Sequence, residues 1–310
     1  MSKPDFKDIR LVIADGGGQI RDELRGILRH EGFRDIVLAD SLAKIEDAVI
    51  SGKIDLLITD HDMPDGNSGE LIRQIRHREI GHNPFIVIIS LAQEPDKDEI
   101  MSIINSGADD LVLKPITTGM IIKRVHFLAN QRKDFVVTSD YIGPTRRSGK
   151  RDGSMEIEEF KVPNPVQRKA FGKTTGAAFQ KEIDEFTSII NEQKVERNAF
   201  QISYLVTRIM PFYSGGKATA DMSDQLNQLR YVSEDFGRRL KGSKYDHVGE
   251  LCDTMLGVVN NVCENPQEPN KKDLLLLPNL AQAIDTAFAA DASETTIARN
   301  IADSVKKRTS

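Results

Sequence analysis

The first 131 residues alternate short apolar runs with amphipathic segments. The apolar runs cover residues 9–14, 36–39, 54–59, 85–90 and 111–113. After each run, apolar residues recur every three or four positions, which is typical of a helix with one buried face. This repetition of strand and helix predicts an α/β, doubly wound, five-stranded parallel sheet with helices on both faces.

Beyond residue 176, apolar residues keep the helical spacing without intervening strand patterns. The spacing predicts one long helix, or two joined end to end, over residues 177–213. Further helices are predicted at 219–240, 245–262, 274–288 and 296–305, and Ser293 is a plausible N-cap for the last of them. We expect residues 177–310 to form an all-α helical bundle, serving as an output or dimerisation domain.

Residues 132–176 carry glycine, proline and mixed charge without an apolar repeat, so we predict an extended arm or linker between domains 1–131 and 177–310. The arm holds a basic cluster, residues 146–151, with Arg146, Arg147, Lys150 and Arg151. A solvated loop is one interpretation of this cluster. Contact with an acidic partner or a phosphate group is the other.

Composition favours a protein that works in water. The 310 residues are 39% hydrophobic and 29% charged, and no stretch approaches the roughly 20 consecutive apolar residues that span a bilayer. The first ten residues lack the apolar core of a secretion signal, so a cytoplasmic location without a membrane partner is expected. The net charge of −5 provides no general attraction to nucleic acid.

Polar side chains stand where several predicted strands end. Asp15 follows the first strand and Asp60 the third, while Ser90 and Lys114 follow the fourth and fifth. The carboxyl ends of parallel strands meet at one edge of the sheet, so these side chains should converge. Carboxylates suit a hard divalent cation, and a lysine with a hydroxyl suits a phosphoryl group.

The stretches Asp60-His-Asp-Met-Pro64 and Gly107-Ala-Asp-Asp-Leu-Val-Leu-Lys-Pro115, with Ser90 between them, carry a family resemblance. Residues 6–130 resemble the receiver domain of two-component response regulators, which has the flavodoxin-like fold of the chemotaxis regulator. The resemblance implies that Asp60 is the phosphoacceptor, Ser90 the switch hydroxyl and Lys114 the phosphate-pairing lysine. It also implies a cis peptide bond before Pro115, Mg²⁺ as cofactor, and a histidine kinase or phosphotransfer protein as partner.

The sequence departs from this family at several positions. The family carries two adjacent acids after the first strand, and here Asp15 is followed by Gly16. We therefore expect weak Mg²⁺ binding, with Asp15, Asp60 and Asp62 as the metal residues; Asp62 either substitutes in part for the missing acid or only caps its loop. Leu111 replaces the usual aromatic switch residue. His61, after Asp60, is expected to be solvated.

These observations predict a response regulator that is phosphorylated on Asp60 and has a helical protein-interaction or dimerisation output. An unidentified protein partner of the helical domain and a homodimer are both expected possibilities. No metabolite turnover is expected, so the chain is not classed as an enzyme. Two alternatives stay open: a degenerate receiver that acts as a phosphorylation-independent scaffold, and a DNA-binding regulator. The latter would use Arg238, Arg239, Lys241 and Lys244, which acidic residues flank.

Overall fold

The computed structural model describes residues 4–146, 157–172, 176–215 and 220–306. The chain divides into two compact units, Met1–Thr187 and Ser188–Ser310. The boundary between the units falls within the long helix α7 (Ala177–Tyr213).

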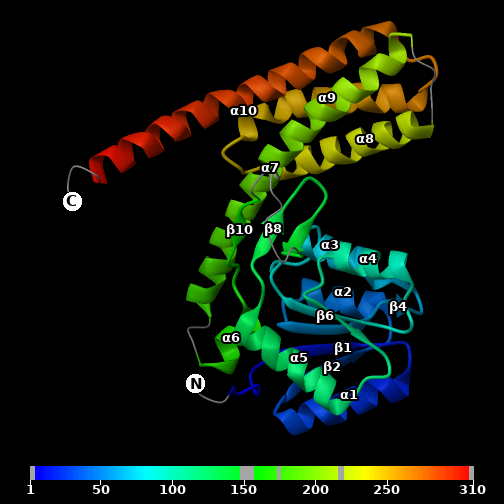
Figure 1. Ribbon diagram of the computed structural model, residues 1–310, viewed down its shortest axis with the longest axis vertical. Helices are drawn as coiled ribbons and strands as arrows, with labels where there is room; N and C mark the ends of the chain where they lie inside the picture. Colours follow the sequence, from blue (N-terminus) through cyan, green and yellow to red (C-terminus); the bar gives the residue numbers. More distant parts are fainter. Residues whose placement is uncertain (1–3, 147–156, 173–175, 216–219, 307–310) are drawn as a thin grey trace. The chain divides into compact units, whose positions relative to one another are not determined.

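The first unit is built on a five-stranded parallel sheet. Its strands, in spatial order, are β2 (Asp35–Ala39), β1 (Arg10–Ala14), β3 (Leu56–Asp60), β6 (Val87–Ala92) and β7 (Asp110–Leu113). Helices α1 (Gly18–Glu31) and α5 (Thr118–Gln131) lie on one face, and α2 (Leu42–Ile50), α3 (Ser68–Arg76) and α4 (Lys97–Ser106) on the other (Figure 1). The doubly wound fold predicted from the sequence is confirmed.

Both faces of the sheet are buried, which explains why its strands read as nearly continuous apolar runs. Along β1, Leu11 and Ile13 join the core beneath α1 and α5. Val12 and Ala14, which point to the opposite face, join the core beneath α2 and α3. The central strands therefore have little freedom to shift by one residue, and the level at which each strand ends is fixed by the two cores.

A short antiparallel hairpin follows β3 and was not predicted from the sequence. It pairs β4 (Asp62–Met63) with β5 (Gly66–Asn67), and Gly66 has a φ of 143°, a conformation that favours glycine. Strands of two residues inside a polar turn leave no alternating pattern to detect. The hairpin fixes the course of the chain directly after Asp60.

Residues 132–176, expected as an extended arm, contribute secondary structure to the first unit. Strands β10 (Glu159–Phe160), β8 (Phe135–Val137) and β9 (Ile142–Pro144) form a small antiparallel sheet, and α6 (Pro165–Ala170) follows. Val166 and Ala170 of α6 are buried in the same core as α1 and α5. Of the basic cluster, Arg147, Lys150 and Arg151 lie outside the described residues.

A buried charge network joins α3, β6 and the start of the arm. Asp109, fully buried, accepts hydrogen bonds from Arg76 at 2.9 Å, from Arg132 at 2.7 Å and from the backbone N–H of Ile88 at 2.8 Å. Both guanidinium groups lie against the ring of Phe135 in β8, at 5.2 and 4.7 Å from its centre. Burial lowers the pKa of Arg76 to about 10, against the opposing attraction of Asp109.

The second unit is helical, as predicted. Most of α7, with α8 (Ala220–Leu240), the 3₁₀ turn η1 (Asp246–Val248), α9 (Gly249–Glu264) and α10 (Lys271–Lys306), surrounds one apolar core. The prediction of two separate helices after residue 270 is wrong, because α10 is continuous and Ser293 lies inside it rather than at a cap. The alanines between residues 287 and 292, without glycine or proline, favour continuation of the helix.

Among the described helices, none combines the length and hydropathy that crossing a bilayer requires.

We expect Asp109→Ala to lower the free energy of unfolding of the first unit by about 3–5 kcal/mol, because it leaves two buried guanidinium groups without a counter-ion. Native-state hydrogen exchange of the β6 amides measures this loss. The neighbouring Asp110→Ala is the matched control, since the ion pair of Asp110 with Arg124 is half-exposed, and we expect about 1 kcal/mol or less. Equal losses in the two variants would contradict this role of Asp109.

Candidate functional site

The polar residues expected at the strand ends come from neighbouring strands of the sheet. Asp15 follows β1, Asp60 is the last residue of β3, and Lys114 follows β7. Strand register places Thr59 between Ala14 of β1 and Ser90 of β6, so these ends lie at one level. The two cores that fix the strands thus also set the positions of the candidate residues.

Lys114 joins the two carboxylates of the site. Its Nζ atom donates to Asp60 Oδ2 at 2.6 Å and to Asp15 Oδ2 at 2.8 Å. The other oxygen of Asp15, Oδ1, accepts the backbone N–H of Gly17 at 2.7 Å, and Asp15 itself is buried. The Lys114–Pro115 peptide bond is cis, as the resemblance implied. Three of the residues singled out in the sequence therefore meet in direct contact.

The charges of the site act on each other. Desolvation by burial is the main cause that raises the pKa of Asp60 above the ordinary aspartate value; the ammonium of Lys114 opposes it, and the charges of Asp15 and Asp62 add to it. Burial works against the charge of Lys114, yet its hydrogen bonds to Asp15 and Asp60 leave the pKa of Lys114 raised. Lys114 therefore stays protonated and partly balances the acids.

Ser90 contributes a hydroxyl with spare hydrogen-bonding capacity. The residue is fully buried, and within the described chain its Oγ atom has no hydrogen-bond partner. Ser90 pairs in register with Thr59, one residue before Asp60, and on its other side with Leu111. A buried hydroxyl without a partner is uncommon in folded proteins, and it leaves Ser90 able to donate to a ligand.

The carboxylates near Asp60 are suited to a hard cation, but one position of the family pattern is filled differently. Asp15, Asp60 and Asp62 offer oxygen ligands, and the latter two are close enough for Asp62 to raise the pKa of Asp60. At Gly16, an added Cβ would lie 3.0 Å from Cγ of Pro64. The donor set fits Mg²⁺, with fewer charges than the family pattern supplies.

The prediction that His61 is solvated is wrong. Its side chain is 2% exposed, and its backbone carbonyl accepts the N–H of Ser68, which follows the β4–β5 hairpin. Asn67 Nδ2 lies 2.6 Å from His61 Nε2, while Asn67 Oδ1 accepts the N–H of Gly69 and caps α3. His61 therefore supports the loop after Asp60, and only the fold of that loop reveals it.

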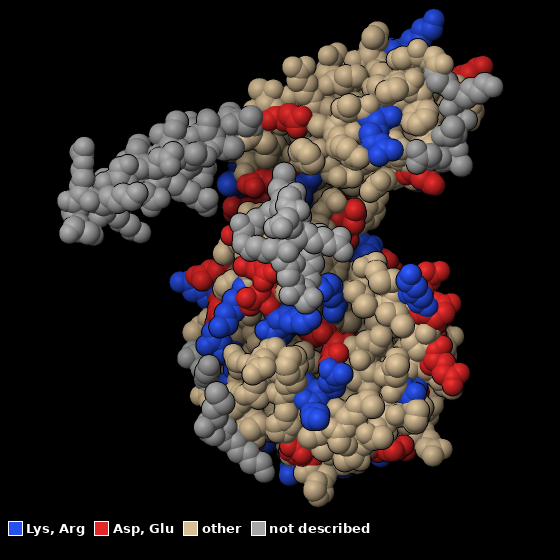
Figure 2. Space-filling model, in the orientation of Figure 1, with Lys and Arg blue, Asp and Glu red and all other residues tan. Residues whose placement is uncertain are grey.

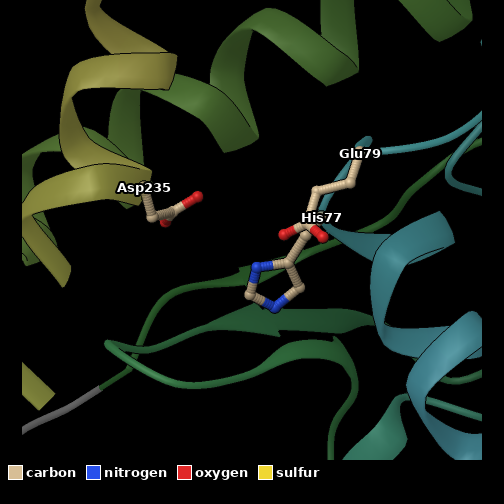
Figure 3. Close-up of side chains that lie close together, drawn as sticks. All are labelled: His77, Glu79 and Asp235. Carbon is tan, nitrogen blue, oxygen red and sulfur yellow. The ribbon is translucent and has the colours of Figure 1, made fainter. Parts of the chain in front are cut away.

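Other groups of potential metal-binding type lie outside this site. Figure 3 shows His77 and Glu79, which follow α3 in the first unit, and Asp235, which belongs to α8 in the second. The backbone N–H of His77 donates to the backbone carbonyl of Arg73 within the first unit. Asp235 accepts from Asn198 at 2.9 Å and from Arg239 at 2.8 Å within the second. None of them belongs to the site around Asp60.

Comparisons with known proteins agree with the geometry of the first unit. Residues 11–126 match the family model of the response regulator receiver domain. The chemotaxis protein CheY of Pseudomonas aeruginosa is 26% identical over 118 residues, which cover 38% of this chain and 93% of CheY. The response regulator SaeR of Staphylococcus aureus is 26% identical over 125 residues, 40% of this chain, and the match spans about half of SaeR at 52%.

Solved structures give similar matches. The chemotaxis protein CheY4 of Vibrio cholerae has 18% identity and a TM-score of 0.35, covering 38% of this chain and 96% of that one. The beryllofluoride-activated receiver domain dimer of NtrC4 has 24% identity and a TM-score of 0.34. The match covers 38% of this chain and 93% of the NtrC4 chain. All the residues of the family match lie in the first unit.

We expect Lys114→Met to raise the pKa of Asp60 further above the ordinary aspartate value, because the variant removes a cation that contacts both Asp60 and Asp15. Asp60 would then become protonated at a higher pH than in the parent chain. Carboxyl-carbon NMR titration in the presence of EDTA measures the shift. Lys44→Met, which removes an exposed ion pair with Asp40, is the control and should leave Asp60 unchanged.

Proposed function

We propose that this chain, whose residues 11–126 form a response regulator receiver domain, accepts a phosphoryl group on Asp60 from a histidine kinase or a phosphotransfer protein. One observation carries the proposal. The carboxylate of Asp60 stands at the end of β3 in contact with Lys114, which also holds Asp15, and the adjacent strand carries the buried hydroxyl of Ser90.

The geometry supports the following chemistry. A carboxylate oxygen of Asp60 attacks the phosphorus of a phosphohistidine, an O–P bond forms, the N–P bond breaks, and the imidazole leaves with the bonding electron pair. In this proposal the ammonium of Lys114 holds a phosphoryl oxygen, and the hydroxyl of Ser90 donates to another. Forming the acyl phosphate uses the ionised form of Asp60, which Lys114 favours.

Mg²⁺, which would be held by Asp15, Asp60 and Asp62, would neutralise charge on the phosphoryl oxygens. In this chain Gly16 supplies no second acid and Pro64 lies beside it. Asp62 is exposed on β4, two residues after Asp60, and its charge acts on Asp60, so it is the residue we assign to add ligand oxygen. We propose that the cation binds weakly and that Asp62 supplies part of the missing charge.

For the second unit we propose a protein-interaction or dimerisation output under the control of the receiver, which spans residues 1–131 and is joined to the helices by the arm. DNA binding has less support. Arg239, one of its candidate contacts, is buried and bonded to Asp235, and the exposed Arg238 is bonded to the same carboxylate. On the face shown in Figure 2, basic and acidic side chains are interspersed over the described residues rather than forming one basic field.

Acetyl phosphate with Mg²⁺ should phosphorylate the full chain on Asp60, and intact-mass spectrometry followed by peptide mapping should locate the adduct. Ser90→Ala and Lys114→Met should slow the transfer by about 10²-fold, because each removes one group that contacts the phosphoryl oxygens. Light scattering with and without beryllofluoride then shows whether the adduct changes the size of the assembly, as the proposed output requires.

Asp60→Asn is the matched control, since it keeps the shape of the side chain and removes the nucleophile. Absence of any adduct at Asp60 under saturating Mg²⁺ would overturn the proposal. The remaining function would then be that of a degenerate receiver that works as a phosphorylation-independent scaffold, for which Gly16 and Leu111 are the sequence features.

We expect Gly16→Asp to tighten Mg²⁺ binding by about ten-fold, because it adds a carboxylate beside Asp15. The gain is limited by Pro64, which must shift by a few tenths of an ångström. Isothermal titration calorimetry of the metal-free protein with Mg²⁺ measures the affinity. Gly16→Asn, which has the same shape without the charge, should give a much smaller gain; equal gains would show that charge is not the limiting factor.

A further inference from the structure

A groove opens on the first unit beside Lys114, on the side of the sheet covered by α1. It has a volume of about 350 Å³, within the range of sites for small molecules. Helix α1 forms one wall, and the loops that follow β6 and β7 form the other. The lining residues are Ile20, Glu23, Leu24, Ile27, Gln93, Glu94, Lys114, Pro115 and Ile116.

The floor of the groove is apolar. Leu24 is 1% exposed and belongs to the core beneath α1 and α5, while Ile20, Ile27 and Ile116 are half-buried and pack against the same core. The side chains therefore present a fixed apolar surface to the groove rather than a mobile one. A ring or a short alkyl chain laid on this surface would bury apolar area that is now in contact with water.

The rim of the groove is acidic. Glu23 and Glu94 are exposed, and within the described parts of the chain neither carboxylate has a hydrogen bond or an ion pair. Lys114, the lining cation, already bonds to Asp15 and Asp60, so its charge is balanced elsewhere. Glu94 also has a φ of 47°, a conformation that non-glycine residues adopt at a cost. The free charge facing the groove is negative.

We propose that this groove binds a small organic cation, with one ring or short alkyl chain bearing an ammonium or amidinium group. The apolar part would lie on Ile20, Leu24 and Ile116, and the cationic group would pair with Glu23 and Glu94 at the rim. Carboxylates bind amidinium-type groups through paired charge-assisted hydrogen bonds. The inference rests on the shape and charge of the groove and does not depend on phosphorylation of Asp60.

Benzamidinium is a suitable probe, and benzamide is its neutral counterpart of nearly the same shape. In the full chain with labelled isoleucine methyl groups, benzamidinium should shift the signals of Ile20, Ile27 and Ile116 and saturate with a dissociation constant of about 1 mM. Benzamide should bind about ten-fold more weakly. Ile45 and Ile72, which lie in the core of the opposite face, should not shift.

The double variant Glu23→Gln/Glu94→Gln should weaken benzamidinium binding about ten-fold while leaving the methyl spectrum of the free protein unchanged elsewhere. Glu46→Gln is the matched control. Glu46 is exposed on α2, so this substitution removes one carboxylate charge on the other side of the sheet. Three results would overturn the proposal: no saturation by about 10 mM, equal binding of benzamide, or full binding by the double variant.

Discussion

The contact of Lys114 with both Asp15 and Asp60 is the interaction around which the first unit is arranged. It joins side chains that are 99 and 54 positions apart in the sequence and that stand at the ends of three different strands. Such a contact forms only if β1, β3 and β7 end at the same level. The two apolar cores enforce that level, because a shift of one residue in any strand would move its buried side chains to the wrong face. The chemistry at the edge of the sheet is thus a consequence of packing inside it.

Asp109, just before β7, likewise joins segments that are distant in sequence. Two arginines and a backbone amide converge on its carboxylate, and the ring of Phe135 covers both guanidinium groups. The network ties β8 to the body of the unit, and α6 is held by its own apolar contacts. Residues that follow the receiver pattern in the sequence are therefore part of the same compact unit. An ion-pair network of this kind is costly to bury, and removing one partner leaves a buried charge without compensation.

The site and the groove beside it differ in the kind of recognition they offer. Around Asp60 the acids are partly balanced by Lys114, and Ser90 supplies a hydroxyl without a partner, which suits a phosphoryl group. In the groove the charge of Glu23 and Glu94 is not balanced, and the floor is apolar, which suits an organic cation. Lys114 lines both, so the same side chain separates a polar reaction site from an amphipathic binding surface.

The sequence by itself determined the α/β fold of the first unit, the helical second half and the meeting of Asp15, Asp60 and Lys114. Each follows from local periodicity, or from the rule that parallel strands end at one edge of their sheet. The burial of His61, the strands of the arm and the Asp109 network were decided by the tertiary structure. His61 contacts Asn67, which belongs to a hairpin too short to leave a pattern. Arg76 reaches Asp109 across 33 positions. Contacts of that range are set by packing, which local patterns do not record.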